Sequence, residues 1–401
     1  MKRIIFHIDV NNAFLSWSAL DLLNHGSKID IRNTYAVIGG DEKARRGIVL
    51  AKSNLCKKLG IQTADTLYSA RKKCPSLKIY PANYSFYKQK SDQLFKLIRS
   101  YSPDIEILSI DECFLDYTKV RKLYGDPVSF AYQLKDQIKK QLKFTVNIGI
   151  GENKLTAKMA SDFEKPDKVH TLWEEEVPKK MFPLPVGNLY GVGKKSTEKL
   201  VRLQIKTIED LAHADLNFLY KYFKNNAYSM IEAANGRNNE EVISDSADPK
   251  GISNSTTLAY DYTSFEEVRP ILLSLSENVA YELHKQKKYA YVVAVQIKDN
   301  FFKTSSHQMT LTNAINTTKE IYEASLKLFQ EFWDKTPIRL LGIRLDHLSE
   351  KPAYQVSLFE KPSEKKENKE LENVIFDLKN KYGKEIIKVA TPKKVEKKYL
   401  K

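Results

Sequence analysis

The apolar and polar positions change their period several times along the chain, and each change predicts a new element. Residues 3–10 form a mostly apolar run that is typical of a buried strand, and the segment NNAFLSWSALDLL after it carries apolar residues at helical spacing. Residues 35–38 and 48–51 predict short strands around a Gly-Gly-Asp turn. The pattern therefore predicts an α+β domain with helices packed on a sheet. Its further elements are a basic helix-like segment at 53–61, helices over 84–101 and 127–142, a strand–turn–strand over 105–118 and a strand over 144–150.

Two segments rich in Pro, Gly, Ser and Asp divide the remainder of the chain. PLPVG at 183–187 and SDSADPKGISNS at 244–255 predict linkers, with short helices between them up to about residue 240. From 257 to 350 helices alternate with strands, which predicts a second, small α+β domain. The rest, 351–401, is charged and partly helical.

Composition adds a preference for an anionic partner. A chain of 401 residues is too long to fold around one hydrophobic core, so several domains are expected. Lys and Arg outnumber Asp and Glu by 65 to 50, a net charge of +15 that favours nucleic acid or an acidic membrane surface, although a merely Lys-rich surface stays open. The cysteines, Cys56, Cys74 and Cys113, show no metal-binding spacing and indicate a reducing compartment. With no signal or membrane-spanning pattern at the N-terminus, a cytoplasmic protein is expected.

The stretch SIDECFLD at 109–116 places two carboxylates inside an apolar run. Burying an unpaired carboxylate is costly, so Asp111 and Glu112 require a strong partner such as a divalent metal ion. Adjacent side chains of a strand point to opposite faces, so both acids reach one ion only near the tip of a hairpin. Asp9 ends the first strand, and the three acids would meet at one sheet edge if the strands are neighbours. An acidic, solvent-facing loop is the alternative.

The residues after Asp9 fit a nucleotide site at the same edge. A helix that opens over Asn11 to Phe14 would direct backbone N–H groups toward a triphosphate. Phe14 would then lie near the sugar and exclude a 2′-hydroxyl, although an ordinary core phenylalanine is the alternative. Basic residues that follow are Lys52, Lys57, Lys58 and Lys165, while most lysines of such a chain lie on solvated faces.

Three segments together resemble the palm motifs of the Y-family translesion DNA polymerases, of the bacterial UmuC/DinB-like type. They are FHIDVNNAF at 6–14, YSPDIEILSIDECFLDYT at 101–118 and VNIGIGENKLTAKMASDFEKPD at 146–167, and the similarity extends over roughly residues 1–350. The resemblance implies a right-hand α+β polymerase with a ferredoxin-like palm, small fingers, a helix-hairpin-helix thumb and an α+β little finger. The implied divisions are palm 1–15 and 77–170, fingers 16–76, thumb 171–242, little finger 251–350 and a charged tail 351–401.

The resemblance also implies roles for single residues. Asp9, Asp111 and Glu112 match the catalytic carboxylates, which bind two Mg²⁺ ions together with the backbone carbonyl of Val10. Phe14 matches the aromatic residue that excludes ribonucleotides. The other residues expected to contact the nucleotide are Asn11, Asn12, Ala13, Asn54, Lys57 and Lys165.

The chain departs from the family pattern in the nucleotide pocket. Asn54 and Lys57 stand where relatives carry Tyr and Arg, so the bidentate and stacking contacts of Arg are lost. Ala13 stands where many relatives carry a second aromatic residue, which loosens the pocket.

Two further motifs point to DNA and to a protein partner. In the thumb, Gly191 and Gly193 form a turn that lets backbone amides approach a DNA phosphate, with Lys194 and Lys195 supplying charge; a plain tight turn is the alternative. The tail segment YQVSLFE is similar to the peptide by which bacterial polymerases bind the sliding clamp, and an edge strand is the alternative. Its expected clamp contacts are Gln355, Leu358 and Phe359 within 355–359.

The implied function is template-directed, error-prone DNA synthesis from a primer 3′ end, with bypass of damaged template bases. The expected partners are primer–template DNA, a deoxynucleoside triphosphate and the sliding clamp, with no membrane, and the expected state is a monomer. Two alternatives stay open: a catalytically silent DNA- or clamp-binding scaffold of the same fold, and a nucleotidyl cyclase with a palm-like sheet.

Overall fold

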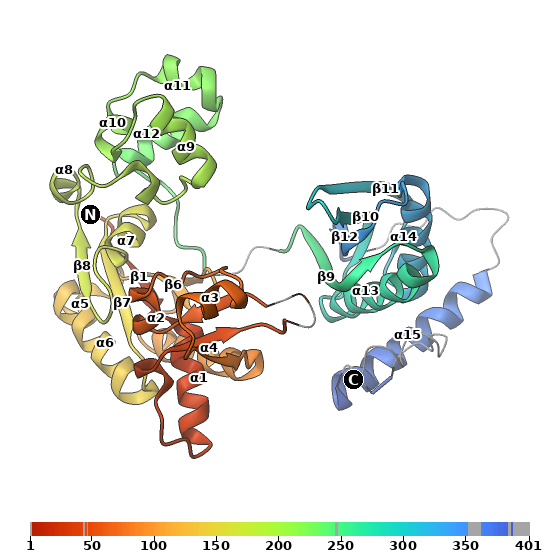
Figure 1. The fold of residues 1–401 in the computed structure, drawn as a ribbon. Helices are drawn as coiled ribbons and strands as arrows, with labels where there is room; N and C mark the ends of the chain where they lie inside the picture. The colour runs from red at the N-terminus through yellow and green to blue at the C-terminus, as the bar shows by residue number, and fades with distance from the viewer. Residues whose placement is uncertain are drawn as a thin grey trace. The chain divides into compact units, whose positions relative to one another are not determined.

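The computed structural model describes residues 2–42, 45, 47–244, 248–351, 362–383 and 386–387. The chain forms two compact units, which are shown in Figure 1. Residues 1–40 and 48–246 make the first unit, and residues 41–47 and 247–401 make the second. The predicted clamp-binding peptide 355–359 lies outside the described residues.

The first unit contains a five-stranded sheet of order β5-β6-β1-β7-β8 and a three-stranded sheet of order β3-β2-β4. Its strands are β1 (Ile5–Val10), β2 (Ala36–Gly39), β3 (Val49–Lys52), β4 (Lys78–Pro81), β5 (Ile105–Ile107), β6 (Glu112–Asp116), β7 (Val146–Gly151) and β8 (Val169–Leu172). Its α-helices are α1 (Ala13–Asn24), α2 (Asn54–Lys58), α3 (Leu67–Lys73), α4 (Tyr84–Arg99), α5 (Arg121–Tyr124), α6 (Pro127–Leu142), α7 (Lys154–Ser161), α8 (Val177–Lys180), α9 (Lys194–Arg202), α10 (Ile208–Ala212), α11 (Leu216–Phe223) and α12 (Asn226–Ala234). Short 3₁₀ turns are η1 (Ile31–Asn33), η2 (Glu174–Glu176) and η3 (Val186–Asn188).

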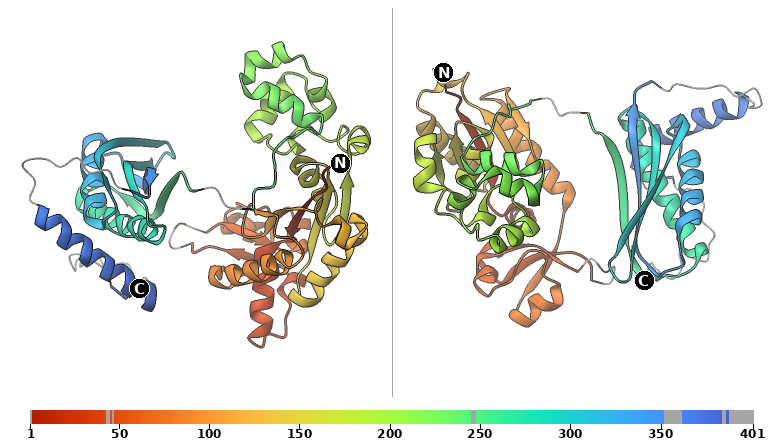
Figure 2. Two further views of the ribbon diagram at one scale, coloured as in Figure 1. Left: turned by 180° about the vertical axis from the view of Figure 1, so that it is seen from behind. Right: turned by 90° about the horizontal axis from the view of Figure 1, so that it is seen from above.

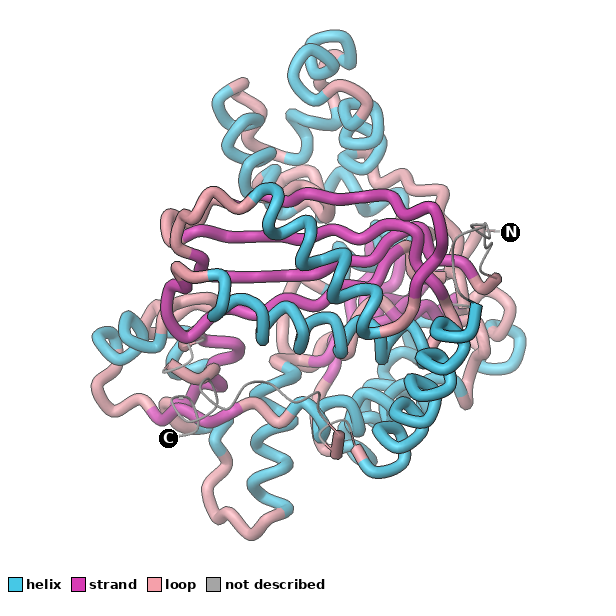
Figure 3. The backbone as a smooth tube through the Cα atoms, turned by 90° about the vertical axis from the view of Figure 1, so that its right-hand side faces the viewer, coloured by secondary structure: helices cyan, strands magenta, loops and turns pink. Residues whose placement is uncertain are grey.

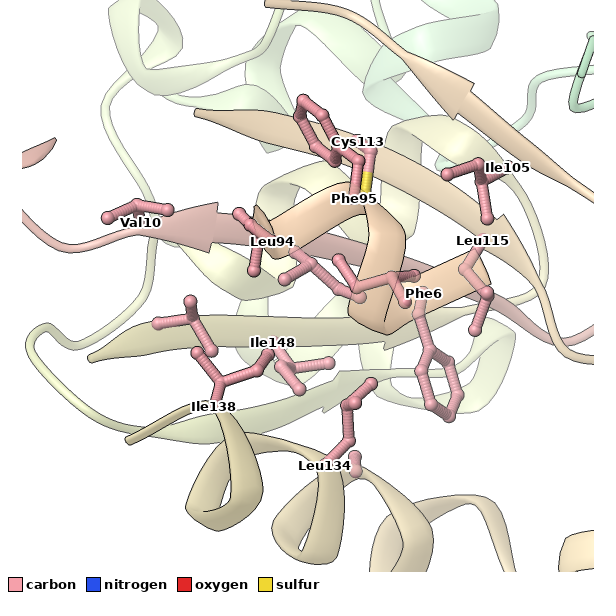
Figure 4. Packing of buried hydrophobic residues seen from close by; sticks show 14 of the residues in the cluster. Phe6, Val10, Leu94, Phe95, Ile105, Cys113, Leu115, Leu134, Ile138 and Ile148 are labelled. Atoms are coloured by element: carbon pink, nitrogen blue, oxygen red, sulfur yellow. The ribbon is translucent and has the colours of Figure 1, made fainter. Parts of the chain in front are cut away.

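The large sheet has the predicted ferredoxin-like arrangement, and we call it the palm sheet. The elements β1, α4, β5, β6, α6 and β7 follow one another as βαββαβ, and β1 lies between β6 and β7, antiparallel to both. Side chains of α4 and α6, including Leu94, Phe95, Leu134 and Ile138, join the sheet in one hydrophobic core (Figure 4). Helix α7 packs on the opposite face, against β7 and β1.

Alternation along β1 decides which side chains reach which face. Phe6, Ile8 and Val10 are buried in the core beneath α4 and α6. The residues between them point the other way, and Ile5 packs against Ala157 of α7. Asp9 therefore belongs to the α7 face of the palm sheet.

Gly149 of β7 lets α7 lie directly on the sheet. A Cβ at Gly149 would lie 2.0 Å from the carbonyl oxygen of Ala157 and 2.3 Å from the backbone nitrogen of Ser161. Both of these are backbone atoms and cannot turn aside as a flexible side chain does. The absence of a side chain at Gly149 therefore sets the distance between α7 and the palm sheet.

The helices α9 to α12 form a group that shares a hydrophobic core with side chains of α7, β8 and α8, and Figure 2 shows this group from two further sides. The predicted linker at 183–187 is wrong because this segment is part of that core. Val186 is buried, its N–H donates to the carbonyl of Lys206 at 2.8 Å, and Pro185 bridges to Thr207. Pro and Gly exclude a continuous helix here, but the apolar side chains between them still bury against α9 and α10.

The second unit is a four-stranded antiparallel sheet of order β11-β10-β12-β9 with α13 and α14 across one face, as Figure 3 shows. Its elements are β9 (Gly251–Tyr262), α13 (Phe265–Lys285), β10 (Tyr289–Asp299), β11 (Thr304–Ile315), α14 (Thr318–Phe332) and β12 (Ile338–Ser349). The predicted linker at 244–255 is wrong over its second half, where Ser253 pairs with Arg344 and Ser255 with Gly342. A polar stretch becomes a strand here because β12 supplies its hydrogen-bonding partners.

A last helix, α15 (Pro362–Tyr382), packs on the helices of the second unit. The carboxylate of Glu372 accepts hydrogen bonds from the N–H and the hydroxyl of Thr318, at 3.0 and 3.3 Å. The ring of Phe376 lies 5.2 Å from that of Tyr281 and 5.7 Å from that of His284. These contacts place the first residue of α14 and the end of α13 beneath α15. Among the described helices, none combines the length and hydrophobicity needed to span a lipid bilayer.

We expect Gly149→Ala to lower the free energy of unfolding of the first unit by about 3 kcal/mol, because α7 must move away from the sheet. Thermal unfolding followed by circular dichroism would measure the change. Gly193→Ala is the matched control, since a Cβ there meets nothing within 4 Å. Equal melting temperatures for the two variants would contradict the close packing of α7.

Candidate active site

One row of side chains crosses the palm sheet at the end of β1. In the register of the sheet Asp9 is the direct partner of Glu112 on β6 and of Asn147 on β7. Directly paired residues of antiparallel strands project from the same face, so these three side chains share the α7 face. The structure thus brings Asp9 and Glu112 together, as the sequence predicted, although they are distant in the chain.

Asp111 lies in the predicted hairpin turn, directly before β6 begins at Glu112. Its backbone carbonyl accepts a hydrogen bond from the N–H of Val10 at 3.0 Å, which ties the turn to the end of β1. The hydroxyl of Ser109 donates to the Asp111 carboxylate at 2.6 Å. The side chain of Val10 is buried in the core, so only its backbone is available at this edge.

Two lysines supply positive charge to these acids. Lys165 forms ion pairs with Asp9 and, at 2.8 Å, with Asp162. Lys158, on α7, forms an ion pair with Glu112. Because α7 is held so near the sheet, the ammonium group of Lys158 reaches the carboxylate row from above.

Glu112 also accepts from a buried histidine. His7 is completely buried, with Nε2 at 3.2 Å from Glu112 Oε2 and Nδ1 at 2.8 Å from Ser161 Oγ. Burial lowers the pKa of His7, which favours the neutral ring with its proton shared toward the carboxylate. The hydrogen bond to His7 and the ammonium group of Lys158 lower the pKa of Glu112 to about 2, although burial opposes them.

The pKa of Asp111 shifts in the opposite direction to that of Glu112. Burial raises the pKa of Asp111, and the nearby charges of Asp9 and Glu112 act in the same direction, against the hydrogen bond from Ser109. Burial lowers the pKa of Lys165, but the charges of Asp9 and Asp162 outweigh it, so the net shift is upward. The site is therefore a cluster of negative charge that favours cations.

The predicted gathering of three carboxylates around one ion is not seen in the side-chain positions. Within the described part of the chain, no three His, Cys, Asp or Glu side chains are close enough together to hold a metal ion. Asp9 and Glu112 instead pair with Lys165 and Lys158. The donor set nevertheless suits a hard divalent cation, because it offers carboxylate and carbonyl oxygens. The pKa of Asp111 is raised, so a nearby positive charge would stabilise its ionised form.

Phe14 is held in place by neighbouring aromatic rings. Its ring stacks on that of Tyr87 with centroids 4.9 Å apart and an interplanar angle of 13°, and it meets the edge of Tyr84 at 6.1 Å. The hydroxyl groups of Tyr87 and Ser18 lie 2.5 Å apart and are hydrogen-bonded, which fixes the ring beneath Phe14. Ala13 is buried at the start of α1. Phe14 is thus a half-buried aromatic with a fixed orientation.

The first turn of α1 offers free backbone donors only in part. Asn12 precedes the helix in the left-handed conformation with φ of 50°, and its side chain donates to the Lys52 carbonyl at 2.7 Å instead of capping the helix. The first N–H groups of a helix have no internal acceptor, so those of α1 remain available to an anion. The N–H of Asn11 is not available to an anion, because it donates to the Thr145 carbonyl at 2.9 Å. The backbone N–H of Asn11 therefore already has an acceptor within the protein, and the nucleotide contact by Asn11 stays a prediction.

The fingers residues lie on a short helix next to this turn. Ser53 caps α2 by accepting from the N–H of Cys56, and Asn54 and Lys57 are exposed one turn apart on α2. Lys52 donates to the Thr63 hydroxyl at 3.1 Å, and burial together with the charge of Lys57 lowers its pKa. Lys52, whose carbonyl binds Asn12, is the fingers lysine tied most directly to α1.

The predicted thumb turn is present as an exposed loop before α9. Gly191 has φ of 91°, which favours glycine, and Val192 is buried between the two exposed glycines. Gly193 meets nothing that would exclude a side chain, so internal packing does not require glycine there. Lys194 and Lys195 are exposed in the first turn of α9. An open backbone with adjacent lysines is suited to a phosphate.

Comparisons with known proteins agree with this geometry. Residues 8–162 match the model of the impB/mucB/samB family, and residues 249–358 match that of the impB/mucB/samB family C-terminal domain. The DNA polymerase IV of Clostridium acetobutylicum is 44% identical over 388 residues, which cover 96% of this chain and 97% of the relative. The chain belongs to the Y family of DNA polymerases.

Other members show the same relationship. The DNA polymerase IV of Clostridium kluyveri is 35% identical over 398 residues, covering 97% of this chain and 98% of the relative. A solved Y-family DNA polymerase chimera shares the fold with a TM-score of 0.76 and 21% identity, over 87% of this chain and all of the chimera. The resemblance and the fold predicted from sequence are thereby confirmed, and the chain is a DNA-directed DNA polymerase. Y-family membership also implies a general dependence on divalent metal ions.

Sequence reasoning missed several residues of the site. His7, Lys158, Ser161 and Asn147 lie around the carboxylate row, but none was singled out from the sequence. His7 was detectable in principle, since alternation places it on the same face of β1 as Asp9. Lys158 and Ser161 depend on how closely α7 approaches the sheet, which no local pattern reports.

Proposed function

We propose that this Y-family polymerase adds deoxynucleotides to a primer 3′ end at the edge formed by Asp9, Asp111 and Glu112. The observation that carries the proposal is the register of β1, which sets Asp9 beside Glu112 while the Val10 N–H fastens the Asp111 turn. The substrates would be primer–template DNA and a deoxynucleoside triphosphate.

The same residues would hold two Mg²⁺ ions, with the Val10 carbonyl as a further ligand. When bound, the ions would activate the primer hydroxyl and neutralise charge on the reacting phosphates. His7 and Lys158 would keep the Glu112 carboxylate ionised and oriented, as its lowered pKa supports. Lys165 would exchange its contact with Asp9 for the triphosphate.

Nucleotide selection would rest on the turn between β1 and α1. The unpaired N–H groups of the first turn of α1, with the exposed Lys57 and Asn54 of α2, would receive the phosphates. Asn12 and Ala13 would shape the pocket floor. Phe14, fixed by its stack on Tyr87, would block a 2′-hydroxyl.

The remaining roles concern the substrate path and the partners. Gly191, Gly193, Lys194 and Lys195 would bind a phosphate of the duplex, and Gln355, Leu358 and Phe359 would bind the sliding clamp. We keep the domain divisions proposed from the sequence, in which 183–187 falls within the thumb, 171–242. We further propose that the enzyme is a cytoplasmic monomer. We also propose that it bypasses damaged template bases, and primer extension across an abasic site would test this bypass.

We expect Glu112→Ala and Asp111→Ala to reduce primer extension at least about a hundredfold while primer–template binding is retained, because alanine removes a charged group at the reacting centre without repelling phosphate. Gel-based primer extension and anisotropy would measure the two properties. Asp104→Ala, which removes a carboxylate paired with the exposed Lys119, is the control. Normal extension by purified Glu112→Ala would refute the assignment.

We expect Phe14→Ala to raise ribonucleotide incorporation relative to deoxynucleotide incorporation by roughly 10- to 100-fold, since the 2′-hydroxyl would no longer meet the ring. Single-nucleotide insertion with matched dNTP and rNTP would measure the ratio of kcat/KM values. Phe86→Ala, which removes a phenylalanine packed on the palm core, controls for general destabilisation. Unchanged sugar discrimination in Phe14→Ala would remove Phe14 from this role.

We expect Lys194→Ala/Lys195→Ala to weaken DNA binding and to reduce the slope of log affinity against log salt concentration by about 0.9 for each lost phosphate contact. Anisotropy titrations between roughly 50 and 200 mM salt would give the slope. The exposed Lys122, on α5, provides the control Lys122→Ala. A slope equal to that of the unchanged enzyme would argue against phosphate binding by the thumb turn.

A further inference from the structure

Two asparagine side chains form a buried pair at the end of the palm sheet. Asn147 is fully buried and Asn11 is 7% exposed. The Asn11 amide nitrogen donates to the Asn147 side-chain oxygen at 3.0 Å. A buried amide without partners is costly, so such a pair is retained only where its other hydrogen bonds are satisfied.

The other hydrogen bonds of the pair all go to the backbone of one segment, 161–168. The Asn147 amide nitrogen donates to the carbonyls of Ser161 at 3.0 Å and Glu164 at 2.7 Å. Its oxygen accepts from the N–H of Lys168 at 3.2 Å. The Asn11 side-chain oxygen accepts from the N–H of Asp167 at 2.9 Å. Bonds thus reach the segment on both sides of Lys165.

The segment needs such support because its own conformation is unfavourable. Asp167 has φ of 63°, which is rare for a residue other than glycine. Its carboxylate forms ion pairs with Lys135 at 2.9 Å and Lys139 at 2.6 Å, both on α6. The segment is therefore fastened to α6 by charge and to β1 and β7 by the asparagine pair.

The hydrogen-bond pattern explains why amides occupy these positions. Asn147 uses both its donors on carbonyl oxygens and its acceptor on two N–H groups, and a carboxylate has no donors. An aspartate at 147 would set an oxygen against the carbonyls of Ser161 and Glu164. An aspartate at 11 would face the Asn147 oxygen without a proton to share.

We propose that Asn11 and Asn147 are positioning residues that hold the 161–168 segment so that Lys165 reaches the triphosphate of the incoming nucleotide. The inference rests on the proposed triphosphate contact of Lys165. It gives Asn11 a role different from the direct contact expected from the sequence: it acts through the backbone of Asp167. Asn147, the direct cross-strand partner of Asp9, links the lysine to the carboxylate row.

The test is single-nucleotide insertion by full-length Asn147→Asp and Asn11→Asp, compared with Lys165→Ala. We expect the KM for dNTP to rise by about tenfold in each asparagine variant, with a smaller change in kcat and an unchanged Kd for primer–template DNA. The double variant Asn147→Asp/Lys165→Ala should be no worse than Lys165→Ala, because the pair acts through the lysine. Asn147→Ser is the milder substitution should Asn147→Asp fail to fold.

Hydrogen exchange supplies a second measurement that does not depend on catalysis. In Asn147→Asp the segment loses the hydrogen bonds to the carbonyls of Ser161 and Glu164. The backbone amides of Asp167 and Lys168, which donate to Asn11 and to residue 147, should then exchange faster because the segment is held less firmly. The control is Asn153→Asp, because Asn153 is also buried but its side chain bonds to the Gly236 carbonyl and to the first turn of α7 instead of to 161–168, and aspartate can also cap a helix. This control should retain the KM for dNTP of the unchanged enzyme.

Three outcomes would contradict these statements in different ways. If Lys165→Ala raises the KM for dNTP but the asparagine variants do not, the positioning role of the pair is wrong while the contact by Lys165 stands. If Lys165→Ala leaves that KM unchanged, the proposed contact fails, and the inference fails with it. A rise in KM for the Asn153→Asp control as large as that for Asn147→Asp would indicate general destabilisation and would also overturn the inference.

Discussion

The register of β1 between β6 and β7 is the constraint on which the candidate active site depends. Because side chains alternate along a strand, a shift of one residue would turn Asp9 into the core beneath α4 and α6 and expose Phe6 to α7. The apolar set Phe6, Ile8 and Val10 prevents that shift. Hydrophobic burial on one face of the palm sheet therefore positions the charged chemistry on the other face.

The candidate site also depends on the balance of charge at the end of β1. Carboxylates gathered at one edge of the palm sheet repel one another, and the opposite pKa shifts of Asp111 and Glu112 show which of the two already has positive partners. Lys158 forms an ion pair with Glu112, and Lys165 forms one with Asp9. The two lysines come from α7 and from the segment after it, so the approach of α7 at Gly149 matters to the chemistry as well as to packing.

Sequence patterns predicted much of this arrangement because local forces dominate it. The apolar run before Asp9 had to be a buried strand, and two adjacent acids between strand-like runs had to lie at a turn. Local reasoning failed where partners are distant. The polar residues 251–255 become a strand only because β12 pairs with them. Residues 183–187 are not a linker, because Val186 is buried against α9 and α10.

The sequence alone determined the family motifs, the acids Asp9, Asp111 and Glu112, and Phe14 on an amphipathic helix, because spacing and residue chemistry are local properties. The tertiary structure decided which groups surround them. It directed the side chain of Asn11 toward Asn147, and it brought His7 and Lys158 to Glu112. Those contacts join residues 46 to 136 positions apart, and only the pairing of β1 and the packing of α7 create them.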